Sequence, residues 1–94
     1  MANILQNENQ WQLTGELLID NASTMLAKSE PLTMAESLTI DFTDVTDADT
    51  SALSLMLAWK RRAAKAECNI QFVNVPTNLV SLANLYGITE FVLA

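Results

Sequence analysis

The hydrophobic pattern along the chain predicts several strands. Apolar side chains alternate with polar ones in residues 11–17 ("WQLTGEL") and in 37–42 ("SLTIDF"), which is typical of strands with one buried face. Residues 69–75 ("NIQFVNV") predict a further strand, and residues 4–5 predict a short edge strand before the first one. Gly15 interrupts the first pattern, so we expect a turn or a bulge at that point.

Three segments between and after these strands show the three- and four-residue spacing of helices. They cover residues 20–28, 50–66 and 77–85, and the second is the longest and most regular of the three. Gly87 is placed to end the third helix in a left-handed conformation, and residues 88–94 predict a short closing element.

The order of these elements predicts the fold class. Strands and helices alternate at the length of strand–helix–strand units, which join parallel strands. We therefore expect an α/β fold, a small and mostly parallel β-sheet of about four to five strands with helices packed on it. Because 94 residues suffice for one core of modest size, residues 1–94 are expected to form a single domain.

The predicted 50–66 helix is apolar on two sides. The first side carries Leu53, Met56, Leu57, Ala63 and Ala64. The second side carries Ala52, Leu55 and Trp59. A helix on a small sheet is expected to bury only one stripe. Leu55 and Trp59 therefore either reach a neighbouring helix or form an exposed apolar patch, which would mark a surface that binds another protein.

The excess of acidic residues limits the kinds of partner. Eleven acids against five bases give a formal net charge of −6. Nucleic acids and anionic lipids attract positive surfaces, so neither is expected as the main partner. Most of the bases gather near the end of the 50–66 helix, where the helix dipole favours cations. They are Lys60, Arg61, Arg62 and Lys65.

Residue types that are rare or absent further limit the kinds of catalytic or metal-binding site that the chain can form. The sequence has no histidine, the commonest general base and metal ligand. Cys68 is the only cysteine, so no internal disulfide can form and a reducing compartment is expected. The first residues do not resemble a signal peptide, and no apolar run reaches the roughly 20 residues of a membrane helix. We therefore expect a cytoplasmic protein, and any link to a membrane would have to pass through a partner.

Four aspartates, Asp41, Asp44, Asp47 and Asp49, lie within nine positions directly before the long helix. Their spacing lacks the alternate ligands and the central glycine of a calcium loop, and no glycine-rich phosphate loop is present. We therefore expect no metal and no cofactor. An enzyme that uses Asp41, Asp44 and Asp49 would need them in one pocket. A simpler interpretation is that Asp49 or Thr50 caps the start of the helix.

The same stretch resembles the signature of the STAS domains, the family of the anti-anti-sigma factors. Members carry a strand that ends in Asp-aliphatic-Ser/Thr, a short loop, and then Asp-Ser/Thr-Ser/Gly-Gly-Leu at the start of a helix. The matching residues here are Asp41-Phe42-Thr43 and Asp49-Thr50-Ser51-Ala52-Leu53, with alanine in place of the usual glycine. The order of the elements also matches over nearly the whole chain.

Within this family, the ending "LVSLANLYGITEFVLA" looks most like the STAS subunits of the Mla systems. These are ABC transporters that move phospholipids between the inner and outer membranes of Gram-negative bacteria and maintain the lipid asymmetry of the outer membrane. The resemblance implies a subunit without enzymatic activity, cofactor or small-molecule substrate. Such a subunit docks on the cytoplasmic ATPase, in one complex with the permease and the periplasmic MCE subunit, and supports its assembly and activity.

The resemblance also implies which residues bind the partner. Thr50 is at the family's switch position, between Asp49 and Ser51, and Leu55 and Trp59 would add an apolar anchor. The alternative within the family is an anti-anti-sigma factor, a partner switch that is regulated by phosphorylation of Thr50 or Ser51.

Overall fold

The computed structural model describes residues 2–92 as a four-stranded sheet with helices packed on it. The strands are β1 (Asn3–Asn7), β2 (Gln10–Leu17), β3 (Ser37–Ala48) and β4 (Asn69–Val73), in the spatial order β1-β2-β3-β4. β1 pairs antiparallel with β2, whereas β2 with β3 and β3 with β4 are parallel pairs. The prediction of a mostly parallel α/β sheet is confirmed.

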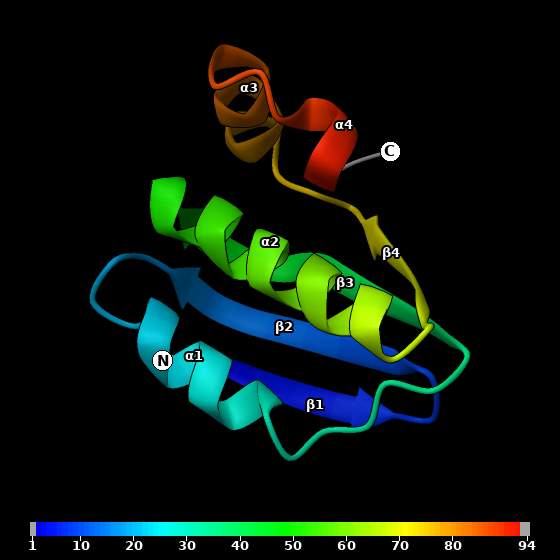
Figure 1. The fold of residues 1–94 in the computed structure, drawn as a ribbon. Helices are drawn as coiled ribbons and strands as arrows, with labels where there is room; N and C mark the ends of the chain where they lie inside the picture. Colours follow the sequence, from blue (N-terminus) through cyan, green and yellow to red (C-terminus); the bar gives the residue numbers. More distant parts are fainter. Residues whose placement is uncertain (1, 93–94) are drawn as a thin grey trace.

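The helices are α1 (Ala22–Ser29), α2 (Thr50–Lys65), α3 (Thr77–Leu85) and the short α4 (Thr89–Val92). α1 and α2 connect successive parallel strands, and both crossovers place their helix on the same face of the sheet, as right-handed connections require (Figure 1). α2 contacts α1 on one side and α3 and α4 on the other. It is therefore the central helix of the layer.

The buried face of α2 is one wide arc rather than one narrow stripe. Its buried residues are Ala52, Leu53, Leu55, Met56, Trp59 and Ala63. At 3.6 residues per turn these positions span about 160° of the helix. The sheet and the flanking helices cover this whole arc.

The expectation that Leu55 and Trp59 form an exposed patch is therefore wrong. Leu55 is 3% exposed and Trp59 is 0% exposed. The alternative expectation, contact with a neighbouring helix, is confirmed for Trp59, whose indole N–H donates to Ser29 of α1. Ala64 was expected on a buried face, but it is exposed because it lies just outside the covered side of α2.

The third strand is longer than the sequence predicted. β3 continues through the acidic residues to Ala48, so the short loop expected before Asp49 is replaced by strand. The pairing of β2 with β3 shifts register once before and once after Gly15, and β3 supplies an extra residue each time. Each shift turns the following side chains to the other face, which ends the regular alternation beyond Phe42. Gly15 has a φ of 88°, in agreement with the predicted bulge.

The predicted closing element of residues 88–94 corresponds to α4, and residues 93–94 lie outside the described part. The end of α3 also follows the prediction. Gly87 has a φ of 67° and ends α3 in the left-handed conformation. The next residue, Ile88, donates its backbone N–H to the carbonyl oxygen of Ala83 at 2.9 Å, which closes the helix end. Among residues 2–92, no helix is both long and apolar enough to cross a membrane.

Candidate functional site

The carboxylate of Asp49 joins the start of α2 to the turn that follows β2. One oxygen accepts the backbone N–H of Ser51 at 2.8 Å, which confirms Asp49 as the N-cap of α2. The other oxygen accepts the backbone N–H of Ile19 at 3.0 Å. Because both oxygens are used, the side chain holds two segments in a fixed relation although they are 30 residues apart in sequence.

These hydrogen bonds also set the charge of Asp49. Partial burial raises the pKa of the carboxyl, but the backbone N–H groups of Ser51 and Ile19 outweigh this and lower the pKa below the ordinary 3.8. Asp49 is therefore ionised at neutral pH, and the folded protein binds its charged form better than its neutral form.

We expect Asp49→Ala to lower the free energy of unfolding by about 1 kcal/mol, since it removes an N-cap. In a domain of this size that is a fall of roughly 4–8 °C in melting temperature. A folded-state pKa below the unfolded value stabilises the protein above pH 4 or so, and this contribution is lost as the pH falls through the folded pKa. The difference between wild type and variant should therefore be constant near pH 7 and shrink below about pH 4.

Thermal melts over this pH range test the prediction. Asp20→Ala removes an exposed acid from the neighbouring turn and serves as the control. A difference between wild type and Asp49→Ala that stays constant down to pH 2 would show that the charge of Asp49 contributes nothing.

Thr50 and Ser51 follow directly as the first residues of α2. Thr50 is exposed, as expected for a residue that a partner contacts, whereas Ser51 is partly buried. Since Asp49 already caps the helix, the hydroxyl of Thr50 is not needed for that purpose. Ala52, which replaces the family's usual glycine, is fully buried, so its methyl group lies on the core side of the helix rather than in front of Thr50.

An apolar hollow of about 280 Å³ lies beside these residues, between α1 and α2. We call it the α1–α2 groove. It is lined by Ile19, Ala22, Ser23, Leu26, Ser51, Ser54, Leu55 and Ala58. Leu55 is almost completely buried, whereas Ile19 is 76% exposed and Leu26 is 37% exposed. The structure thus brings Asp49, Ser51 and Leu55 to one place, with Thr50 next to them in the chain.

Ile19 and Leu26 were not predicted as site residues. Ile19 continues the apolar run of β2 but falls in a turn, where an apolar side chain is unusual, and this is the one signal that the sequence offers. Leu26 belongs to α1, and its exposure depends on how far α1 lies from α2. Periodicity within one helix carries no information about that distance.

Trp59 lies apart from the groove, in the core. Its indole N–H donates to the hydroxyl of Ser29 at 2.9 Å, and its ring makes an edge-to-face contact with Trp11 at 5.6 Å. The guanidinium of Arg62 covers the Trp11 ring and donates to the backbone carbonyl oxygens of Ser29 and Leu32. These interactions fix the end of α1 against α2, so Trp59 has a structural role. Because Trp59 is completely buried, the structure does not support it as one of the partner-binding residues.

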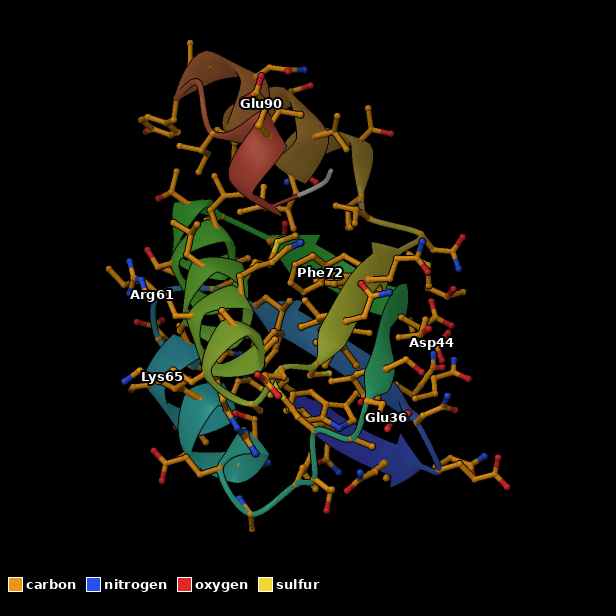
Figure 2. The ribbon with its side chains drawn as sticks, turned by 45° about the vertical axis from the view of Figure 1, so that its right-hand side comes forward. Glu36, Asp44, Arg61, Lys65, Phe72 and Glu90 are labelled. Atoms are coloured by element: carbon orange, nitrogen blue, oxygen red, sulfur yellow. The ribbon has the colours of Figure 1, made fainter. Side chains whose placement is uncertain are left out.

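Asp41 and Asp44 accept hydrogen bonds from different partners. Asp41 accepts hydrogen bonds from Thr43 and Asn74, and this pairing with Thr43 outweighs partial burial and lowers the pKa of Asp41. Asp44 accepts from Gln12 instead. Figure 2 shows Asp44 on the opposite side of the molecule from Arg61 and Lys65 of α2. None of the three acids considered for catalysis lines the α1–α2 groove, and residues 2–92 contain no group of acids and cysteine placed to hold a metal ion.

Cys68 is buried and unpaired among the described residues. Burial raises the pKa of its thiol, although the nearby charge of Arg62 opposes this. A buried thiol of raised pKa is poorly reactive, so Cys68 is a residue of the core rather than a candidate nucleophile.

Solved structures of similar fold include two forms of one regulator and a sulfate transporter family protein. The anti-sigma factor antagonist SpoIIAA in its unphosphorylated form aligns with a TM-score of 0.65 at 13% identity, over 90% of this chain and 83% of that one. The phosphorylated form of SpoIIAA, a Bacillus cell fate determinant, aligns with a TM-score of 0.68 at 13% identity, over 97% and 87%. A sulfate transporter family protein from Wolinella succinogenes aligns with a TM-score of 0.68 at 13% identity, over 87% and 68%.

At this low identity the three structures establish a shared fold and nothing further. No curated protein sequence matches the chain. A family model described as "Mlab, STAS domain" does match, over residues 2–94. That match covers nearly the whole sequence, including the Asp49-Thr50-Ser51 segment and every element of the sheet. The chain belongs to the STAS domain family.

Proposed function

We propose that this chain is the STAS subunit of an Mla-type phospholipid transporter and docks on the cytoplasmic ATPase of that ABC system. The observation that carries the proposal is the exposed Thr50, at the capped start of α2 and beside an apolar groove. The family description of the matching model supports the choice of an Mla system over other STAS proteins.

The proposed docking face consists of Asp49, Thr50, Ser51 and the α1–α2 groove. It combines an apolar centre with a polar, charged border, the composition that protein–protein interfaces favour. Asp49 fixes both borders of the groove, because it binds backbone groups of Ile19 and Ser51 together. A face that is already rigid loses little conformational entropy when a partner binds.

In this role the chain carries out no reaction itself. It binds the ATPase at the inner membrane, supports its assembly and activity, and contributes to lipid asymmetry only through the complex. The permease and the periplasmic MCE subunit are then indirect partners. In this role the residues of the docking face bind the partner protein and take no part in lipid or nucleotide chemistry.

The second candidate function is an anti-anti-sigma factor, and the exposure of Thr50 also favours it. A kinase can reach an exposed hydroxyl, and phosphate at a helix N-terminus is stabilised by the dipole. The charges of Asp47 and Asp49 oppose this, because an added phosphate next to them is repelled. Thr50 or Ser51 would be the modified residue.

Purification of the tagged chain from its native cell separates the two functions. We expect an ABC ATPase with its permease to be recovered in stoichiometric amounts. Recovery of a kinase-like anti-sigma factor instead, together with phosphate on Thr50 or Ser51 by mass spectrometry, would replace the first proposal by the second.

A further inference from the structure

The side of α2 that lines the α1–α2 groove continues beyond the groove toward the end of the helix. Ser51, Ser54 and Ala58 line the groove at intervals of three and four residues. Continued at that helical spacing, the same side reaches Arg61 and Lys65. Figure 2 shows these two cations on one side of α2, away from Asp44 and Glu36. The apolar groove is therefore followed, along the same side of α2, by a basic surface at Arg61 and Lys65.

The other end of the groove is acidic. Ile19, on its border, is followed in the chain by the exposed Asp20 and is bonded through its backbone to Asp49. α1 and α2 are parallel because both return from the same end of the sheet, so both N-termini lie at this end (Figure 1). Each helix dipole places about half a positive charge at this N-terminal end and about half a negative charge at the C-terminal end. At the N-terminal end of the helices, the charges of Asp20 and Asp49 outweigh the positive partial charges of the two dipoles. At the C-terminal end, the charges of Arg61 and Lys65 outweigh the negative partial charges.

The ends of α1 do not cancel this polarity. Lys28 and Glu30, near its last turn, carry opposite charges and offset one another. Arg62 donates to the backbone carbonyl oxygens that follow α1 and neutralises the negative end of that helix. The exposed Glu67, just after α2, offsets only one of the two positive charges of Arg61 and Lys65. The surface along the groove is thus polarised, from acidic at Asp20 and Asp49 to basic at Arg61 and Lys65.

The walls of the groove favour a helix as the occupant. They consist of side chains of two helices, whose backbone groups are already paired within each helix, so an extended segment would find no backbone partners. A helix satisfies its own backbone and presents a row of apolar side chains. The volume of about 280 Å³ is at the lower limit of ligand pockets, roughly 300 to 1,000 Å³, and holds a few side chains rather than a whole small molecule.

We propose that the groove binds one amphipathic helix of the partner protein, antiparallel to α1 and α2. The acidic first turn of that helix lies at Arg61 and Lys65, and its basic last turn lies at Asp20 and Asp49. Acids in the first turn and bases in the last are the ordinary preference of a helix, so this one orientation matches both the side-chain charges and the dipoles. The distance from Ser51 to Lys65 corresponds to about four turns of helix. The inference rests on the proposed function, since it specifies the partner element at the same docking face.

Site-specific photo-crosslinking in the native cell tests this orientation with the full chain. A benzophenone amino acid replaces Ile19 in one strain and Lys65 in another, and the crosslinked peptides are identified by mass spectrometry. We expect both positions to capture one helix of the partner, Lys65 near the start of that helix and Ile19 near its end. The reverse order, capture of a non-helical segment, capture of a lipid, or no crosslink to protein would each overturn the inference.

The result separates this inference from the proposed function. The identity of the captured protein tests the function, whereas the segment and the order of the two crosslinks test the helix. An ATPase captured through a loop would leave the function standing and remove the helix. A helix captured from a protein other than an ABC ATPase would support the helix and contradict the proposed function.

Two matched variants measure the apolar contribution. Ile19→Ser and Leu85→Ser each remove a large aliphatic side chain, 76% exposed in one case and 75% exposed in the other. Leu85 lies at the end of α3, away from the groove. We expect Ile19→Ser to weaken binding about tenfold or more and Leu85→Ser to leave it unchanged, with the melting temperature unaffected in both. Equal affinities of the two variants would contradict the proposal.

Discussion

Trp59→Ala is expected to lower the free energy of unfolding by about 3 to 5 kcal/mol. The indole is completely buried, makes an edge-to-face contact with Trp11 and donates to the hydroxyl of Ser29. Alanine would leave a cavity at the centre of the contact between α1, α2 and the sheet. Since small domains have a total stability of roughly 5 to 15 kcal/mol, the loss is a large share of it.

Chemical denaturation followed by circular dichroism measures this loss. Trp59→Phe keeps most of the apolar surface and removes the N–H donor, so we expect a smaller loss, about 1 to 3 kcal/mol. If Trp59→Ala were to unfold at the wild-type denaturant concentration while failing to bind the partner, Trp59 would be a surface residue in solution. The arrangement of α1 on α2 described above would then be wrong.

Thr50→Glu is expected to reduce the affinity for the partner 100-fold or more while the isolated domain stays folded. The side chain is exposed and at the start of α2, where the helix dipole tolerates a negative charge, so the stability should change by no more than about 1 kcal/mol. In the complex, the added carboxylate would be desolvated beside the charge of Asp49, and the longer side chain would have to enter a packed contact. That penalty amounts to several kcal/mol, and each 1.4 kcal/mol corresponds to a factor of ten in affinity.

Thr50→Ser is the matched control, since it keeps the hydroxyl and the size of the contact, and we expect it to bind within a few-fold of wild type. Co-purification of the complex and thermal melts of the isolated variants provide the two measurements. Co-purification of Thr50→Glu at the wild-type yield would remove Thr50 from the interface, and with it the central residue of the docking face.

Local sequence patterns predicted the elements well wherever one residue or one short repeat decides the conformation. The parallel sheet follows from strands and helices that alternate at crossover length. Gly87 ends α3 because glycine adopts a positive φ without strain, and Asp49 begins α2 because a short carboxylate reaches the free N–H groups of the first turn. Each of these outcomes depends on interactions within a few residues.

The course of β3 was decided by its partner strand. Its alternation of apolar and polar residues ends near Phe42, so the sequence predicted an earlier end to the strand. Two bulges let β3 remain paired with β2 while its side chains change faces, and the bulges depend on the pairing of two separate strands. No pattern within β3 alone reports that pairing.

For the candidate site, too, local features could be predicted from the sequence, whereas the positions of separate elements could not. The sequence alone determined that a capped helix begins at Asp49 or Thr50, because capping is a local interaction, and the structure assigned the cap to Asp49. Only the tertiary structure decided that Trp59 belongs to the core and that Ile19 and Leu26 border a groove with Leu55. The width of the buried arc of a helix depends on how many neighbours flank it, and α2 is flanked on both sides. Periodicity along one helix gives the direction of its apolar side chains, but the positions of the other elements determine which of those side chains remain exposed.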